Sequence, residues 1–270
     1  MEMRTPRQFF STLTGIITAI FMLASLADRE LFPVVFDVFG ITLGFGLSAI
    51  ELVIPLTALI ADLGMYYALK TYLKETTDPL ILHLFLPLAV TLTIGVSLRN
   101  LGSGLTGWGL LFITAALLYL VLRFEFISCD PASAHRALSI IVLDSLCYTV
   151  FLLFVITLRA NVIRPVICLG SILILCFVVS VKIYSFHVVS FNVPIMALVT
   201  TMMMIFSDAG LRFCPINIVS YGSLMFIWYY TFTAFLIGAD REEPIRSVLL
   251  RILPVEIPAL LVLTYSLIKI

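Results

Sequence analysis

Long apolar runs alternate with short polar connections along the whole chain. Nine runs are each about 20 residues long, at 8–27, 49–69, 79–98, 105–124, 137–158, 162–182, 187–206, 216–238 and 252–269. A helix that spans a bilayer needs roughly 20 mostly apolar residues. The pattern therefore predicts an all-α transmembrane bundle of about nine spanning helices, with eight or ten as neighbouring counts. We expect one membrane domain over residues 1–270.

The first run follows Arg4 and Arg7, which resembles the charged start of a signal peptide. However, the run is too long for a signal core, and no small-residue cleavage site precedes Asp28. We therefore expect a retained first helix.

The stretch between the first two runs has a different period. From Ile41 to Ser48, apolar residues alternate with threonine, glycine and serine, which is the period of a strand. Gly40 suits a turn between two strands, and a strand pair with open edges cannot lie inside the hydrocarbon. We predict a small β-hairpin over 33–48 at the membrane interface. The alternative is one long kinked helix over 33–69.

A second exception precedes the last run. Glu242, Glu243 and Pro244 suit the start of a helix. The apolar residues that follow lie on one helix face: Ile245, Val248, Leu249 and Ile252. We predict an amphipathic helix over 242–253 on the cytoplasmic surface, followed by the final span.

The composition excludes a soluble globule. The chain is 61% hydrophobic and 12% charged, whereas soluble domains are about half apolar and about a quarter charged. The net charge is zero and no basic tract is present, so we expect no nucleic-acid partner. The five cysteines include no CxxC pair, which argues against a disulfide framework or a zinc site. The expected surroundings are the lipid bilayer and other membrane-protein subunits.

The distribution of lysine and arginine predicts the orientation. With the N-terminus in the cytoplasm, ten of these residues lie on the inner side and six on the outer side. We predict a cytoplasmic N-terminus. A change of one helix in the count would invert half of this assignment.

Four acids lie within the predicted spans: Glu51, Asp62, Asp144 and Glu256. Such residues are costly in a membrane and usually face the bundle interior. In the predicted orientation, Asp62 and Asp144 each lie seven residues from the inner end of their helix, roughly 10 Å below the same surface. Glu51 and Asp62 are eleven residues apart, which returns to nearly the same helix face.

These acids and the cations at the cytoplasmic helix ends define a candidate polar pocket of Asp62, Asp144, Glu51, Arg123 and Lys182. It would open to the cytoplasm and bind a cation, a proton or a basic head group. The alternative is that each acid bonds to a neighbouring helix and only fixes packing. His83, His135 and His187 are expected to be ordinary interfacial histidines.

No spacing predicts catalysis or metal binding. A HisGluXXHis motif, paired aspartate motifs and a Walker-type loop are absent. Ser103 lies between two glycines, but no histidine follows in a later helix core to act as its base. We assign no catalytic residue, no metal ligand and no cofactor. A pigment or lipid can still bind an apolar groove without a motif.

Three stretches resemble an uncharacterised bacterial family of polytopic membrane proteins, defined only as a domain of unknown function. They are GlyIleThrLeuGlyPheGlyLeuSer at 40–48, LeuIleAlaAspLeuGlyMetTyrTyr at 59–67 and LeuArgPheGluPheIleSerCysAspPro at 122–131. The resemblance implies the same helical layout, Asp62 in a matching place, and a bacterial cytoplasmic (inner) membrane. It carries no assigned reaction.

The lack of motifs, the short connections and the apolar exterior favour a non-enzymatic accessory or scaffold subunit of a membrane assembly. The alternative is a small transporter or an ion- or proton-conducting protein that uses Asp62 and Asp144. An enzyme acting on lipid is the third hypothesis, and it would need a water-accessible groove with at least two convergent polar residues.

Overall fold

The computed structural model describes residues 5–26, 30–38, 41–73, 79–101, 105–160, 165–188, 192–214 and 216–268. It divides into two compact units, Met1–Ser139 and Ile140–Ile270, which are described separately. Whether they form the single membrane domain predicted over 1–270 stays a prediction. Among the described residues, nine helices are long and apolar enough to cross a membrane. This confirms the predicted count for that part of the chain and fits a multi-pass integral membrane protein.

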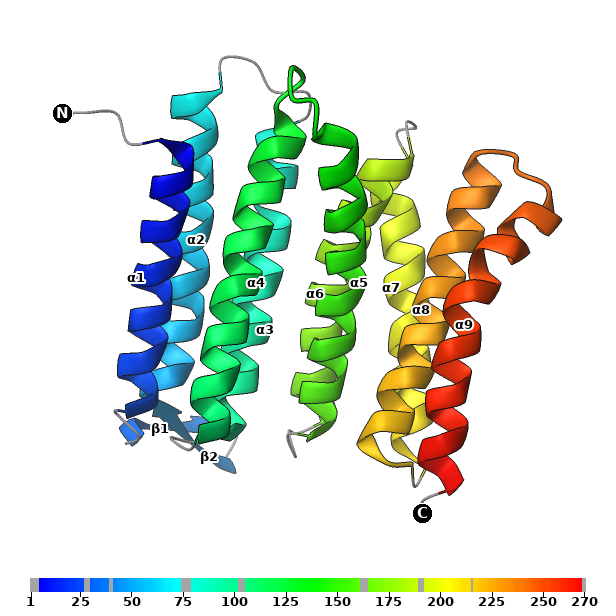
Figure 1. Ribbon diagram of the computed structural model, residues 1–270. Coiled ribbons are helices and arrows are strands. Elements are labelled where there is room, and N and C mark those ends of the chain that lie inside the picture. The colour runs from blue at the N-terminus through cyan, green and yellow to red at the C-terminus, as the bar shows by residue number, and fades with distance from the viewer. Residues whose placement is uncertain are drawn as a thin grey trace. The chain divides into compact units, whose positions relative to one another are not determined.

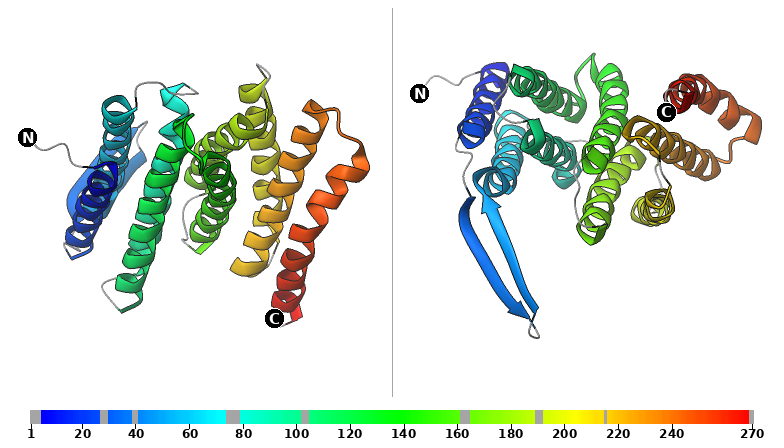
Figure 2. Two further views of the ribbon diagram at one scale, coloured as in Figure 1. Left: turned by 45° about the horizontal axis from the view of Figure 1, so that its top comes forward. Right: turned by 90° about the horizontal axis from the view of Figure 1, so that it is seen from below.

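Four long helices form most of the described part of the first unit, and Figure 1 shows how they run alongside one another. These are α1 (Pro6–Leu26), α2 (Ala49–Tyr72), α3 (Phe85–Leu101) and α4 (Leu105–Cys129), with a short 3-10 helix, η1 (Leu80–His83), before α3. Helices α1 and α3 each pack against both α2 and α4, so the four helices close on one another (Figure 2, right). The buried face of α2 includes several small residues, among them Ala58, Ala61 and Ala68, which let its neighbours approach closely.

Two antiparallel strands precede α2. They are β1 (Glu30–Val38) and β2 (Ile41–Ser48). The strands lie at one end of the four helices and project sideways from them (Figures 1 and 2). Because the chain is extended up to Ser48 and becomes helical at Ala49, the alternative of one long helix over 33–69 is wrong. The turn at Gly40 lies outside the described residues, and the interfacial position of the strands stays a prediction.

The second unit contains the remaining helices: α5 (Arg136–Ala160, whose first turn belongs to the first unit), α6 (Pro165–His187), α7 (Val193–Arg212), α8 (Ile218–Asp240) and α9 (Ile245–Ile268). Helix α6 packs against α7, and α8 packs against α6, α7 and α9. Helix α5 contacts α8 through aromatic rings, because Phe151 stacks on Tyr229 with 4.0 Å between the ring centroids.

Glycines set the closest helix contacts. A Cβ atom added to Gly95 of α3 would lie 2.3 Å from Cγ1 of Ile54 in α2. One added to Gly238 of α8 would lie 2.4 Å from Cγ2 of Val248 in α9. At both positions the absence of a side chain is what lets the two helices touch.

The C-terminal segment differs from the predicted division into a surface helix and a span. One helix, α9, runs from Ile245 to Ile268 and includes Pro254 and Pro258. Its first turns run across the direction of α8, and the rest then follows α8 (Figures 1 and 2). A proline inside a helix removes a backbone hydrogen bond and bends the axis. The predicted surface helix (242–253) and the predicted span (252–269) are therefore parts of one bent helix. The position of its first turns on the cytoplasmic surface stays a prediction.

Candidate functional site

The five residues of the predicted pocket fall in different units. Glu51, Asp62 and Arg123 belong to the first unit, and Asp144 and Lys182 belong to the second. The side chain of Glu51 lies outside the described part of the structure, and Arg123 is exposed. A pocket that joins all five residues therefore stays a prediction, and the local surroundings of each residue are considered within its own unit.

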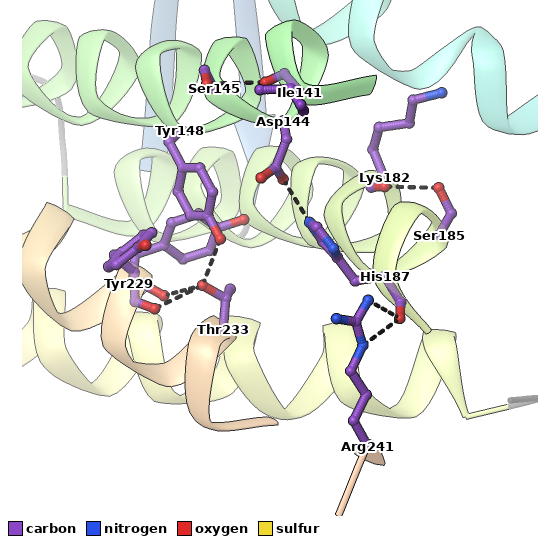
Figure 3. Close-up of polar contacts among 11 residues, drawn as sticks. Ile141, Asp144, Ser145, Tyr148, Lys182, Ser185, His187, Tyr229, Thr233 and Arg241 are labelled. Carbon is purple, nitrogen blue, oxygen red and sulfur yellow. Dashed lines mark hydrogen bonds and ion pairs between the residues drawn. The ribbon is translucent and has the colours of Figure 1, made fainter. Parts of the chain in front are cut away.

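In the second unit, Asp144 of α5 faces His187 at the end of α6 (Figure 3). The Nε2 atom of His187 lies 3.3 Å from Oδ1 of Asp144. This is an ion-pair distance, although the geometry does not meet hydrogen-bond criteria. The side chain of His187 is 29% exposed and that of Asp144 is 25% exposed. The expectation that His187 is an ordinary interfacial histidine therefore missed its acidic neighbour.

Tyr148 lies one helical turn after Asp144 on the same face of α5. Its hydroxyl is 2.9 Å from the Thr233 hydroxyl on α8, and its ring packs edge-on against Tyr229 and Tyr230. These contacts fix the tyrosine between two helices. The Asp144 carboxylate is thus placed beside a rigid aromatic wall.

Arg241, just after α8, closes the other side of this site (Figure 3). Its Nε and Nη2 atoms donate to the backbone carbonyl of His187, at 3.1 and 2.8 Å. A cation suits this place because the carbonyls at the end of a helix carry partial negative charge. Glu243 lies 3.7 Å from Arg241 and accepts a 2.5 Å hydrogen bond from Arg251 of α9. Charged groups of both signs therefore surround His187.

Lys182 does not join this group. It is only 1% exposed, its ammonium lies 4.8 Å from the centroid of the Phe186 ring, and its side chain extends away from Asp144 (Figure 3). The structure thus separates the two pocket residues of the second unit. Glu256, the fourth predicted intramembrane acid, accepts a hydrogen bond from Thr231 of α8.

The Oδ1 atom of Asp62, in the first unit, has no such partner among the described residues. The residue is half-buried on α2 at the edge of the buried face, and its Oδ1 atom is buried and receives no hydrogen bond from any described residue. It lines a groove between α2 and α3 whose other walls are Pro55, Ala58, Leu59, Leu63, Tyr66, Leu84, Leu88 and Leu92. Of the two acids predicted to form an inward-facing stripe on α2, only Asp62 has a described side chain, and it lies in an apolar groove.

Sequence reasoning missed two buried acids. Glu125 of α4 has Oε2 2.8 Å from Nδ1 of His83, and both side chains are buried. Asp208 of α7 is 0% exposed, pairs with Arg212 at 2.6 Å and accepts a hydrogen bond from Tyr221 of α8. The spacing of Asp208 and Arg212, four residues apart, was a signal for an ion pair on one helix face. No local signal links His83 with Glu125.

The described part of the chain holds no cluster of three or more histidine, cysteine or acidic side chains suited to a metal ion. The chemistry that the second-unit site offers is ion pairing and hydrogen bonding, because it brings together a carboxylate, an imidazole and a guanidinium.

One protein-family model matches most of this chain. The chain belongs to the family described as "Protein of unknown function (DUF5656)". The match covers residues 30–266 and therefore includes the strand pair, Asp62 and the Asp144–His187 site. No curated protein and no solved structure shows significant similarity to the chain. The nine apolar helices of the described residues fit a multi-pass integral membrane protein, and the role of this member of the DUF5656 family is argued below from its own residues.

Proposed function

We propose that this protein is a non-enzymatic accessory or scaffold subunit of a membrane assembly. The observation that carries the proposal is that buried hydroxyl groups form hydrogen bonds between different helices of the second unit. Ser180 of α6 bonds to Tyr229 of α8 at 3.0 Å, and Tyr184 of α6 bonds to Thr200 of α7 at 2.6 Å. Together with Tyr148 and Thr233, these pairs join different helices.

Such bonds fix the packing of neighbouring helices. A scaffold needs a rigid bundle with an apolar exterior, and the outward faces supply that exterior with large side chains such as Phe112, Phe206 and Leu261. The proposed setting is the bacterial cytoplasmic membrane, with the N-terminus inside and the strands β1 and β2 at the outer interface.

Purification from native membranes in a mild detergent tests the role. A scaffold subunit should elute with at least one stoichiometric partner, and the complex should be larger than the 30.0 kDa chain. Recovery of a lone monomer with no partner, under conditions that preserve a known membrane complex from the same cells, would count against the proposal.

A second candidate is a small ion- or proton-conducting transporter. The observation that favours it is the partly open pair of Asp144 and His187, since a carboxylate beside an imidazole can pass a proton. In reconstituted vesicles, Asp144→Asn and Asp62→Asn should each abolish a measurable cation or proton flux. Equal flux from wild type and both variants excludes a conducting role for these carboxylates.

A further inference from the structure

The groove between α2 and α3 carries a single carboxylate among apolar walls, with a volume of about 500 Å³. We propose that it binds a single-chain amphiphile with a protonated amine, whose ammonium pairs with Asp62 and whose alkyl chain lies along the groove. This site goes beyond the scaffold role and does not depend on it.

The buried carboxylate oxygen is the first argument. A buried acid is normally hydrogen-bonded or paired, and an unpartnered one is destabilising. Three other acids of the described chain each have a cationic or hydrogen-bonding partner: Asp208 pairs with Arg212, Glu125 with His83, and Asp144 lies at ion-pair distance from His187. Oδ1 of Asp62 receives no hydrogen bond from the described residues. An ammonium ion supplies both the donors and the positive charge that this oxygen lacks.

The size of the groove is the second argument. A volume of about 500 Å³ lies in the range of small-molecule sites, which are mostly apolar with a few polar groups. A partner helix of roughly 10 Å diameter and 30 Å length occupies on the order of 2,000 Å³, which is much more than this groove can hold. The groove therefore suits a slender chain better than another helix.

Length and depth agree with one leaflet of a bilayer. The lining residues of α2 run from Pro55 to Tyr66, a rise of about 16 Å, which is close to half of the roughly 30 Å hydrocarbon core. Asp62 is nearer to the Tyr66 end, and exposed Lys70 follows at the end of the same helix. The amine would thus lie nearer the membrane surface, and the alkyl chain would run towards Pro55 and Leu92.

Access from the lipid is the third argument. Leu59, Leu63 and Tyr66 line the groove and are 55%, 58% and 40% exposed. These side chains face whatever surrounds the first unit, which for a membrane protein is lipid. An amphiphile could enter sideways without crossing the helix core.

Photolabelling of the full-length protein in nanodiscs of zwitterionic lipid tests the proposal. The probes are dodecylamine and dodecanol, each with a diazirine in the alkyl chain, and peptide mass spectrometry locates the label. The amine should label the α2 segment from Pro55 to Asp62 about tenfold more than the alcohol, which corresponds to about 1.4 kcal/mol. Asp62→Asn keeps the shape of the side chain and should reduce amine labelling to the level of the alcohol.

Two further variants complete the design. Asp130→Asn, in the turn after α4, retains its hydrogen-bond acceptor for the Ala132 amide and should leave the amine preference unchanged. Leu88→Trp should fill the groove and suppress labelling by both probes, and it serves as the test if Asp62→Asn does not fold. Equal labelling by amine and alcohol, or an amine preference that survives Asp62→Asn or Leu88→Trp, would overturn the proposal. A partner helix found cross-linked in the groove would also overturn it.

Discussion

At Asp208, one buried carboxylate accepts hydrogen bonds from two helices. Arg212 donates from α7 itself at 2.6 Å, and Tyr221 donates from α8 to the other oxygen. The guanidinium of Arg159 on α5 lies 5.1 Å from the centroid of the Tyr221 ring. Three helices of the second unit therefore meet at a fully satisfied carboxylate.

Removal of this carboxylate should destabilise the second unit strongly. Asp208→Ala leaves Arg212 and Tyr221 without their acceptor, and breaking a buried ion pair typically costs about 3 kcal/mol. Tyr221→Phe removes one donor and should cost about 1 kcal/mol. Titration with a denaturing surfactant, monitored by circular dichroism, measures the free energy of unfolding of each variant relative to the wild type.

The double variant separates a coupled cluster from independent losses. Residues in one hydrogen-bond network are not additive, so Asp208→Ala with Tyr221→Phe should cost less than the sum of the two single changes. A simple sum, or wild-type stability for Asp208→Ala, would contradict the structural role given to this carboxylate.

Sequence patterns identified some of the important acids and missed others for a physical reason. Asp62 and Asp144 stand in the middle of apolar runs, where any charge is conspicuous. Asp208 and Glu125 stand near the ends of their helices, where charges are common and burial depends on the neighbouring helix. The partner of Glu125 is 42 residues away along the chain, so only the tertiary fold brings it to His83.

Among the helices, the contact of α2 with α3 depends on Gly95. Gly95→Ala should destabilise the first unit by about 1–3 kcal/mol, because the new methyl group overlaps Ile54 and overpacking has this typical effect. The same surfactant titration measures it. The combination of Gly95→Ala with Ile54→Ala should recover part of the loss, since it removes the overlapping atoms.

Gly109 of α4 is the matched control. It is a helical glycine, and apart from the backbone of its own helix no described part of the chain lies within 4 Å of an added Cβ. Gly109→Ala should be neutral or slightly stabilising, because alanine is the better helix former. If Gly95→Ala and Gly109→Ala behave alike, close packing at Gly95 is not what holds α2 against α3.

The apolar runs predicted the existence and the order of the helices better than their limits. Hydrophobicity measures whether a segment can lie in lipid, and it does not show where a helix continues beyond the hydrocarbon. For this reason α4 extends to Cys129, past the predicted end at 124, and α9 already begins at Ile245. Proline was a weak guide in α9, because Pro254 and Pro258 bend the helix and do not end it.

For the whole molecule, the number of helices determines which connections share a side of the membrane. Three helices, α5 to α7, separate the connection after α4 from the connection after α7, so these two connections should face opposite sides. One natural probe is available, because Cys214 after α7 is exposed and the other four cysteines are buried. With the N-terminus in the cytoplasm, Cys214 should face outward.

A membrane-impermeant maleimide should therefore label the wild-type protein in right-side-out vesicles, and Cys214→Ser should abolish this labelling. A cysteine introduced by Ala134→Cys into the Cys214→Ser protein should react only in inside-out vesicles, since residue 134 is exposed in the connection after α4. The reversed pattern would show that the number of crossings is right but that the orientation predicted from the ten inner and six outer basic residues is wrong. Labelling of both positions from the same side would contradict three crossings between them, and the orientation assigned to every later helix would then change with it.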